Sequence, residues 1–165
     1  MCARDPLFWV NSFVWTYDPR LKQSVVPFVT YASYQDETIL AIVDSIESGG
    51  DVLIEKSRDM GASWLCLLVF TWYWHFHPEK SFLVASRKED LVDKTDDPDS
   101  LFWKIDFILK WEPSWLAPIH ERTSLHFLNV ENDSTIDGAS TTSDTARGDT
   151  IVVTLAASSR TSSRK

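Results

Sequence analysis

The apolar run from Trp64 to Phe76 limits the possible folds more than any other feature of the sequence. It is too short to cross a lipid bilayer, which takes about 20 apolar residues in a helix. We therefore interpret it as a buried helix that ends at His77-Pro78. Its aromatic side chains are expected to pack in a core rather than to stack on bases: Phe70, Trp72, Tyr73 and Trp74.

Short apolar segments on both sides of this helix predict a sheet. The segment DVLIEKS, residues 51–57, is rich in β-branched side chains and predicts a buried strand, and Ser81–Ser86 predicts a second one. Strand, loop, helix and strand in this order form a βαβ unit with a right-handed crossover. The expected fold class is therefore α/β with a parallel sheet flanked by helices.

Other segments show weaker patterns. Helices are predicted at Asp36–Ser48, which Gly49 and Gly50 stop, and at Leu101–Leu109. A hairpin is predicted around residues 131–133 and a strand at 151–155, whereas residues 86–99 and 139–148 are interpreted as loops. The expected domains are an irregular aromatic arm (1–30), a main domain (31–155) and a disordered Ser/Arg tail (156–165).

Charge and cysteine content limit the possible partners and compartment. The formal net charge of the 165 residues is -8, which argues against strong binding of nucleic acid by this chain alone. The two cysteines, Cys2 and Cys66, have neither a disulfide nor a zinc spacing, and the N-terminus has no signal pattern. We expect a protein of the reducing cytoplasm that does not enter a membrane.

The window EKSRDMGASW, residues 55–64, carries the chemistry. A phosphate-binding loop reads GxxxxGK[ST] between a strand and a helix. Aligned on Gly61, this chain has Ala62 in place of the lysine and retains the hydroxyl at Ser63. Backbone amides at the helix start would face a phosphate, and Lys56 and Arg58 are the local cations. The alternative is an ordinary turn flanked by surface charges.

The loop KSRDMGASW resembles the variant Walker A loop of phage terminase large subunits, in which the lysine can precede the central glycine. Three further stretches are also similar to that family and follow the same order. They are RDPLFWVNSFVWTYDPR with VPFVTYASYQDETIL, then SFLVASRKEDLVDKTDDPDSLFWKIDFIL, and finally IDGASTTSDTARGD. The resemblance extends from about Arg4 to Asp149. It implies a P-loop NTPase-like parallel sheet, incomplete at the C-terminus.

The resemblance also implies a function, namely the ATPase that drives viral DNA packaging. Its cofactors would be ATP and Mg²⁺, with Ser63 holding the metal and Lys56 neutralising the phosphates. Its partners would be double-stranded DNA, the portal protein and the small terminase subunit, in an oligomer on the portal in the host cytoplasm. The nucleotide-binding residues would be Gln35, which reads adenine, and the loop Lys56, Ser57, Arg58, Asp59, Met60, Gly61, Ala62 and Ser63.

The sequence departs from the family after Asp149. In the family an apolar strand there ends in Asp-Glu, the Walker B pair that holds Mg²⁺ and orients water. Here residues 151–155 lead to Ala156-Ala157-Ser158, and no acidic residue follows Asp149. We expect a truncated or frameshifted form with little ATP hydrolysis alone. The alternatives are an inactive prophage remnant or interaction module, and another P-loop translocase or helicase.

Three further groups of residues could bind ligands. Arg87 and Lys88 are possible contacts for phosphate or DNA, because ligands bind at the carboxyl ends of parallel strands. The resemblance implies Arg147 as a further contact near the nucleotide. His75 and His77 could form a metal pair, but they do not share a helix face, and we interpret them as a helix end near solvent. The acidic residues of the loop lack calcium-loop spacing and are interpreted as solvated: Asp93, Asp96, Asp97 and Asp99.

Overall fold

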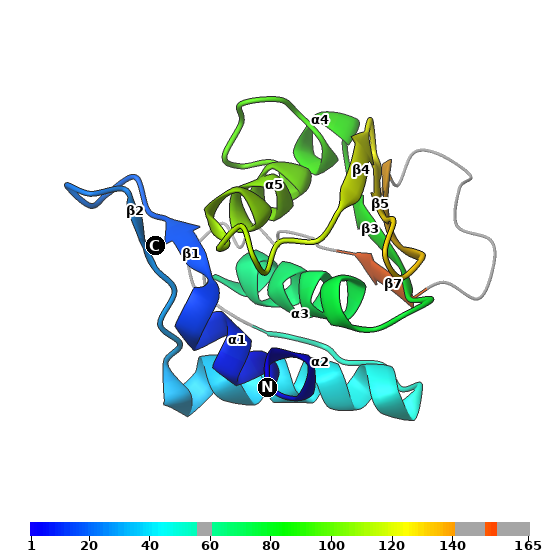
Figure 1. The fold of residues 1–165 in the computed structure, drawn as a ribbon, viewed down its shortest axis with the longest axis horizontal. Helices are drawn as coiled ribbons and strands as arrows, with labels where there is room; N and C mark the ends of the chain where they lie inside the picture. The colour runs from blue at the N-terminus through cyan, green and yellow to red at the C-terminus, as the bar shows by residue number, and fades with distance from the viewer. Residues whose placement is uncertain (56–60, 141–150, 155–165) are drawn as a thin grey trace, which may run out of the picture.

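The computed structural model describes residues 1–55, 61–140 and 151–154, the last of these as backbone only. Its helices are α1 (Pro6–Phe13), α2 (Glu37–Ser48), α3 (Ala62–Phe76), α4 (Glu89–Val92) and α5 (Leu101–Trp111). Its strands are β1 (Trp15–Tyr17), β2 (Val25–Pro27), β3 (Ser81–Ser86), β4 (His120–Thr123), β5 (His126–Asn129), β6 (Ser134–Ser140) and β7 (Ile151–Thr154). Figure 1 shows their arrangement.

The main sheet is mixed rather than parallel throughout. Its strand order is β4-β5-β6-β3-β7, and β3 is parallel to both β6 and β7. The other pairs, β4 with β5 and β5 with β6, are antiparallel, because short turns connect them. The expected all-parallel sheet is therefore wrong in detail, although the α/β class and the predicted hairpin around residues 131–133 are confirmed.

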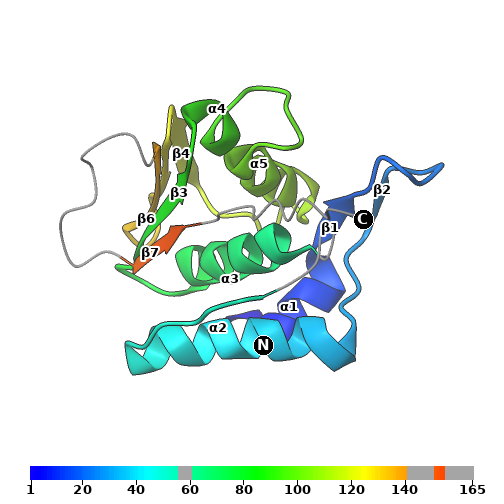
Figure 2. The same cartoon turned by 180° about the vertical axis from the view of Figure 1, so that it is seen from behind.

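One face of the sheet carries the core. Phe82, Phe127 and Ile136 point towards this face and are fully buried. Phe82 stacks on Phe70 of α3 with ring centroids 4.8 Å apart, and Phe127 contacts Phe102 of α5 at 5.1 Å. All the helices within the described ranges lie on this side of the sheet, as Figures 1 and 2 show.

Helix α3 is the central element of this core. The helix predicted from the apolar run is confirmed, and its aromatic residues are buried at the expected positions: Phe70, Trp72, Tyr73 and Trp74. None of the helices in the described part of the chain is long and apolar enough to cross a membrane. Helix α4 packs closely on the sheet at Gly138, where an added Cβ would lie 2.7 Å from the side chain of Val92.

The N-terminal residues form regular structure where an irregular arm was expected. Asp5 accepts a hydrogen bond from the Phe8 amide at 3.0 Å and so caps α1, and Pro6 suits the first helical position. Trp9 of α1 is fully buried in the main core, and strands β1 and β2 pair as a small antiparallel hairpin. This segment therefore packs as part of the globular fold.

The strand predicted at residues 51–57 is wrong for its described part. Residues 51–55 form no strand, and the side chain of Leu53 is 96% exposed. The βαβ unit expected from the sequence therefore lacks its first strand among the described residues, and the parallel partners of β3 come from later in the chain. The predicted strand at 151–155 is present as β7.

Two predicted loops contain regular structure. Residues 89–92 of the charged loop form α4, with Val92 buried, and residues 139–140 belong to β6. The rest of the Ser/Thr-rich loop, residues 141–150, and the tail predicted as disordered lie outside the described residues.

Candidate nucleotide-binding site

The start of α3 is the structural centre of the predicted site. Gly61 adopts a left-handed backbone conformation, with φ at 75°, directly before the helix, and its carbonyl accepts the amide of Leu65 at 3.1 Å. A residue with a side chain would be strained in this conformation. Gly61, the N-cap residue of α3, has no side chain to cap the helix, and the first amides of such a helix start can bind an anion.

Gln35 reaches the start of α3 from a different part of the chain. It lies in a π-helical turn, Ala32–Asp36, that leads into α2, and its side chain is more than nine-tenths buried. Its Nε2 atom lies 3.6 Å from the position that a Cβ on Gly61 would occupy. The structure thus brings together two residues of the site that was predicted from sequence.

The amide group of Gln35 is held in one orientation. Its Oε1 accepts a hydrogen bond from the backbone amide of Tyr31 at 3.0 Å. Its Nε2 is not one of the buried polar atoms that lack a hydrogen-bond partner among the described residues. The donor end of the amide lies near the start of α3, where it could donate to an acceptor such as a phosphate oxygen.

Two tyrosine rings accompany Gln35 on the same turn. Tyr31 and Tyr34 are stacked with an interplanar angle of 11° and centroids 5.7 Å apart. Tyr31 is 64% exposed. The sequence interpretation missed this pair, although the spacing YASYQ places two aromatic residues on one side of the turn.

The helices α2 and α3 run in the same direction, so that both begin at the same side of the molecule (Figures 1 and 2). The positive ends of both helix dipoles therefore face that side. Asp36, at the start of α2, has a buried Oδ1 atom without a hydrogen-bond partner among the described residues. This carboxylate would oppose an anion nearby, so a bound phosphate requires a cation as well.

The cations predicted for this role cannot be placed. Lys56, Arg58 and the rest of the loop, Ser57, Asp59 and Met60, lie outside the described residues, as does Arg147. Of the remaining loop residues, Ala62 is buried and Ser63 is half-buried in the first turn of α3. The hydroxyl of Ser63 is a suitable ligand for Mg²⁺ beside a phosphate. Over the described ranges, no group of three or more His, Cys, Asp and Glu side chains could hold a metal ion.

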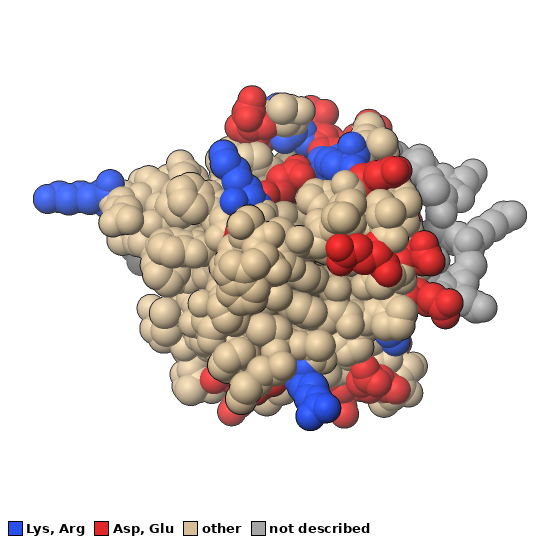
Figure 3. Space-filling model, in the orientation of Figure 1, with Lys and Arg blue, Asp and Glu red and all other residues tan. Residues whose placement is uncertain are grey.

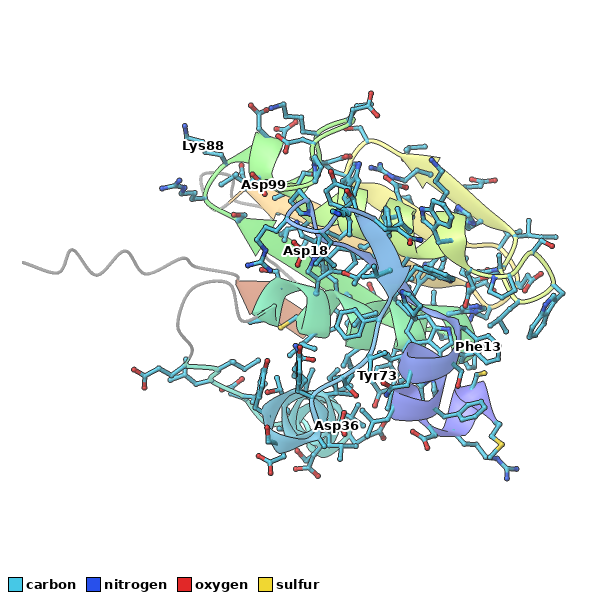
Figure 4. All side chains as sticks on the ribbon, turned by 90° about the vertical axis from the view of Figure 1, so that its left-hand side faces the viewer. Phe13, Asp18, Asp36, Tyr73, Lys88 and Asp99 are labelled. Atoms are coloured by element: carbon cyan, nitrogen blue, oxygen red, sulfur yellow. The ribbon has the colours of Figure 1, made fainter. Side chains whose placement is uncertain are left out.

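Arg87 and Lys88 follow the end of β3. Both are exposed, and Lys88 precedes α4. In Figure 4, Lys88 lies at the opposite edge of the molecule from Asp36, which stands directly before α2. Lys88 is therefore separate from the start of α2.

The side chain of His75 is buried and His77 is half-buried, whereas a helix end near solvent was expected for both. The side chain of His75 is 5% exposed, and its Nε2 lies 3.2 Å from Oε2 of Glu112. Glu112 also accepts a hydrogen bond from Nε1 of Trp9 at 2.7 Å. Burial lowers the pKa of His77, and nearby Lys80 lowers it further. No short sequence motif predicts the two contacts of Glu112, because Trp9 lies on α1, His75 on α3 and Glu112 directly after α5.

The acidic loop residues form ion pairs. Asp93 accepts from Nη1 and Nη2 of Arg122 at 3.0 and 2.6 Å, and Asp97 pairs with Lys94 at 2.9 Å. Burial alone would raise the pKa of Asp93, but hydrogen bonds from Arg122 and from the Leu125 amide bring it below its ordinary value. Asp93 is thus a structural residue rather than a solvated one.

The sequence matches no protein-family model and no curated protein. The resemblance to terminases therefore gains no independent support from such comparisons. The arguments for function come from the start of α3 and from the residues around it.

Proposed function

We propose that this chain binds a nucleoside triphosphate at the start of α3. The single observation that supports this most is the position of Gln35, whose Nε2 lies 3.6 Å from the position that a Cβ on Gly61 would occupy. A helix start that begins at a left-handed glycine, with an amide donor of Gln35 nearby, suits the oxygens of a phosphate group.

The wider arrangement is compatible with an ATPase domain. Helix α3 packs on a sheet in which β3 and β7 are parallel neighbours, and β7 is the apolar strand that would precede the Walker B acids in a terminase. Lys56 would then supply the charge for the phosphates and Ser63 would bind Mg²⁺. Gln35 would contact the nucleotide, as in the family, with ATP as the ligand.

On this proposal the chain is the nucleotide-binding part of a terminase large subunit. DNA, the portal protein and the small subunit would be partners of the whole motor, and the host cytoplasm its location. The face of the molecule in Figure 3 carries no broad basic patch, and its described charged side chains are scattered or acidic. Contact with DNA by this chain alone is therefore not part of the proposal.

A second candidate is an interaction module without nucleotide binding. Its support is the exposed aromatic and aliphatic side chains that follow α5, namely Trp115, 73% exposed, and Ile119, 68% exposed. Trp115 contacts Phe13 of α1 with centroids 5.6 Å apart, so the N-terminal segment borders this surface. Such exposed aromatic side chains are typical of protein-binding surfaces.

Binding of a ribose-labelled fluorescent ATP analogue with Mg²⁺ tests the first candidate. Lys56→Ala should weaken binding about tenfold or more, because a charge-assisted contact to phosphate is lost. Lys88→Ala removes an equally charged side chain, which Figure 4 shows at the opposite edge of the molecule from Asp36, and should leave binding unchanged. Binding that survives Lys56→Ala unchanged would show that the loop is assigned wrongly, and no binding at all would favour the interaction module.

Hydrolysis should be weak even when the nucleotide binds. Residues 156–158, which follow the strand predicted at 151–155, are Ala-Ala-Ser, so the acidic pair that positions metal and water in the family has no counterpart at these positions. Phosphate release by this chain alone should stay close to the rate of a buffer control. Turnover that disappears in Lys56→Ala would contradict this expectation.

A further inference from the structure

Aromatic side chains are grouped at the surface where the end of α1 and β1 meet the segment after α5. Trp115 contacts Phe13 with ring centroids 5.6 Å apart, and Trp111 contacts Trp15 at 6.1 Å. Trp115 is 73% exposed and Trp111 is 42% exposed, while Phe13 and Trp15 are half-buried. We call these four residues the aromatic surface. Grouped apolar side chains at the surface are typical of binding sites, whereas single ones are not.

The two segments that carry these rings expose one charge, and it is positive. Residues 6–17 include no charged residue, and residues 107–119 include only Lys110 and Glu112. The side chain of Glu112 is 1% exposed, whereas Lys110 is exposed at the end of α5. A partner that covers the aromatic surface therefore meets a lysine and no exposed carboxylate from these segments.

The turn that joins β1 and β2 adds further cations. Arg20 and Lys22 are exposed there, and Asp18 forms an ion pair with Arg20 at 2.8 Å. In Figure 3, uncharged residues fill the middle of the face, over α1 and β1, and red side chains gather over the sheet and the loop before α5. The formal net charge of the chain is -8, so the aromatic surface is bordered by cations in an otherwise acidic molecule.

This arrangement suits a protein segment better than a nucleic acid. Single strands are bound by ring faces that follow one another along a basic groove. Here the ring planes of Phe13 and Trp115 are at 90°, those of Trp15 and Trp111 are at 40°, and the cations are few. A segment with apolar side chains for the rings and carboxylates for the cations complements both features of the surface.

We propose that the aromatic surface binds an acidic amphipathic segment of a partner protein, whose apolar side chains pack on Trp111 and Trp115 and whose carboxylates face Lys110. This inference rests on the second candidate function, the interaction module, and names the chemistry of its partner. It does not require a nucleotide at the start of α3.

Two labelled helical peptides test this inference on the full chain by fluorescence anisotropy. Both have leucines along one face, and the other face carries glutamates in the acidic peptide and glutamines in the neutral one. The acidic peptide should bind about fivefold more tightly at low salt, although the net charge of the chain alone would favour the neutral peptide. The difference should disappear at about 0.5 M salt.

Substitutions separate the apolar contacts from the charge. Trp115→Ala should weaken both peptides about tenfold, because an exposed aromatic anchor is lost. Lys110→Glu should weaken only the acidic peptide, about fivefold. Lys88→Glu, at the opposite edge of the molecule from Phe13 in Figure 4, should change neither, and nor should Tyr31→Ala, whose exposed ring stacks on Tyr34 instead.

The outcomes distinguish this inference from the functions proposed above. Equal binding of the two peptides at low salt would overturn the acidic partner, while an aromatic interaction surface would stand. An oligothymidylate that displaces the acidic peptide in a Trp115-dependent manner would show that the partner is a nucleic acid instead. Binding that Trp115→Ala leaves unchanged would place the peptide elsewhere. If neither peptide binds, the inference and the interaction module both fail, and binding of the ATP analogue is measured separately.

Discussion

A buried carboxylate at Glu112 shows how single contacts decide the stability of this core. Its side chain is 1% exposed, and it faces Nε1 of Trp9 at 2.7 Å and Nε2 of His75 at 3.2 Å. A buried carboxylate is costly unless donors surround it. The Trp9 indole therefore stabilises the fold both by its apolar area and by this hydrogen bond, which ties α1 to the segment after α5.

At the residue scale we predict that Trp9→Phe costs more than Trp74→Phe. Both indoles are fully buried, but Nε1 of Trp74 has no hydrogen-bond partner among the described residues. Both substitutions lose ring volume, and only Trp9→Phe leaves a buried acceptor without its donor. The difference in the free energy of unfolding, measured with urea, should be about 1–3 kcal/mol. Equal losses would show that the Trp9–Glu112 hydrogen bond is not formed.

At the scale of elements, Asp93 joins the end of α4 to the turn between β4 and β5. It accepts two hydrogen bonds from Arg122 and one from the Leu125 amide at 2.8 Å. The guanidinium of Arg122 also lies over the rings of Phe102 and Phe127, 5.0 and 4.5 Å from their centroids. One arginine therefore links α5, two strands and the acidic loop.

This link predicts a dependence of stability on pH. The pKa of Asp93 lies below its ordinary value, so its stabilisation is complete above that value and is lost as the pH falls through the lower folded-state pKa. Asp93→Asn should lower the free energy of unfolding by about 1.5–3 kcal/mol at pH 7. That difference from the wild type should shrink below about pH 4.

Asp106→Asn is the matched control for this prediction. The carboxylate of Asp106 also faces Arg122, but its contacts are 3.3–3.4 Å long and its side chain is 45% exposed. Its removal should change the free energy of unfolding by less than about 1 kcal/mol. Equal effects of the two substitutions in urea titrations at pH 7 would contradict the assignment of Asp93 as the main partner.

The elements that could be predicted from the sequence are those with a local signal. Helix α3 follows from its apolar run, and β3 has the predicted bounds because a short apolar segment precedes a charged turn. Residues 51–55 show an equally strong strand pattern, but a strand forms only where a neighbour offers hydrogen bonds. Strand β4, with the sequence HERT, has no apolar alternation, so only its pairing with β5 reveals it.

The candidate site could be predicted in part, because some of its residues carry a signal in the sequence. Gly61 and Gln35 carry signals in the sequence, the first from loop spacing and the second from family resemblance. Their proximity depends on the packing of α2 against α3, which no local pattern encodes. The orientation of the Gln35 amide and the Tyr31–Tyr34 stack likewise depend on the π-helical turn, which the sequence did not indicate.

At the scale of the whole molecule, Cys66 reports on the integrity of the core. Its side chain is buried in the middle of α3, and burial raises the pKa of its thiol to about 11. Because only the thiolate reacts, Cys66 should resist a disulfide reagent at pH 8 until the protein unfolds. Cys2 is only half-buried, so one thiol per chain should react quickly in the native protein.

A Cys2→Ser variant tests this prediction directly, because Cys66 is then the remaining thiol. It should show no fast phase with the reagent, and its remaining thiol should react at a rate that rises with urea concentration. Fast reaction of Cys66 in the absence of denaturant would show that α3 is not buried as described.

The shared direction of α2 and α3 has a consequence for anion binding by the Lys56→Ala variant. The partial positive charges at their two starts belong to peptide groups, so neither a point substitution nor a change of pH removes them. An anion attracted to this side of the protein would still feel them after Lys56 is replaced. Such a variant would therefore retain a residual, salt-sensitive attraction for polyphosphates, set by the direction of the chain rather than by its side chains.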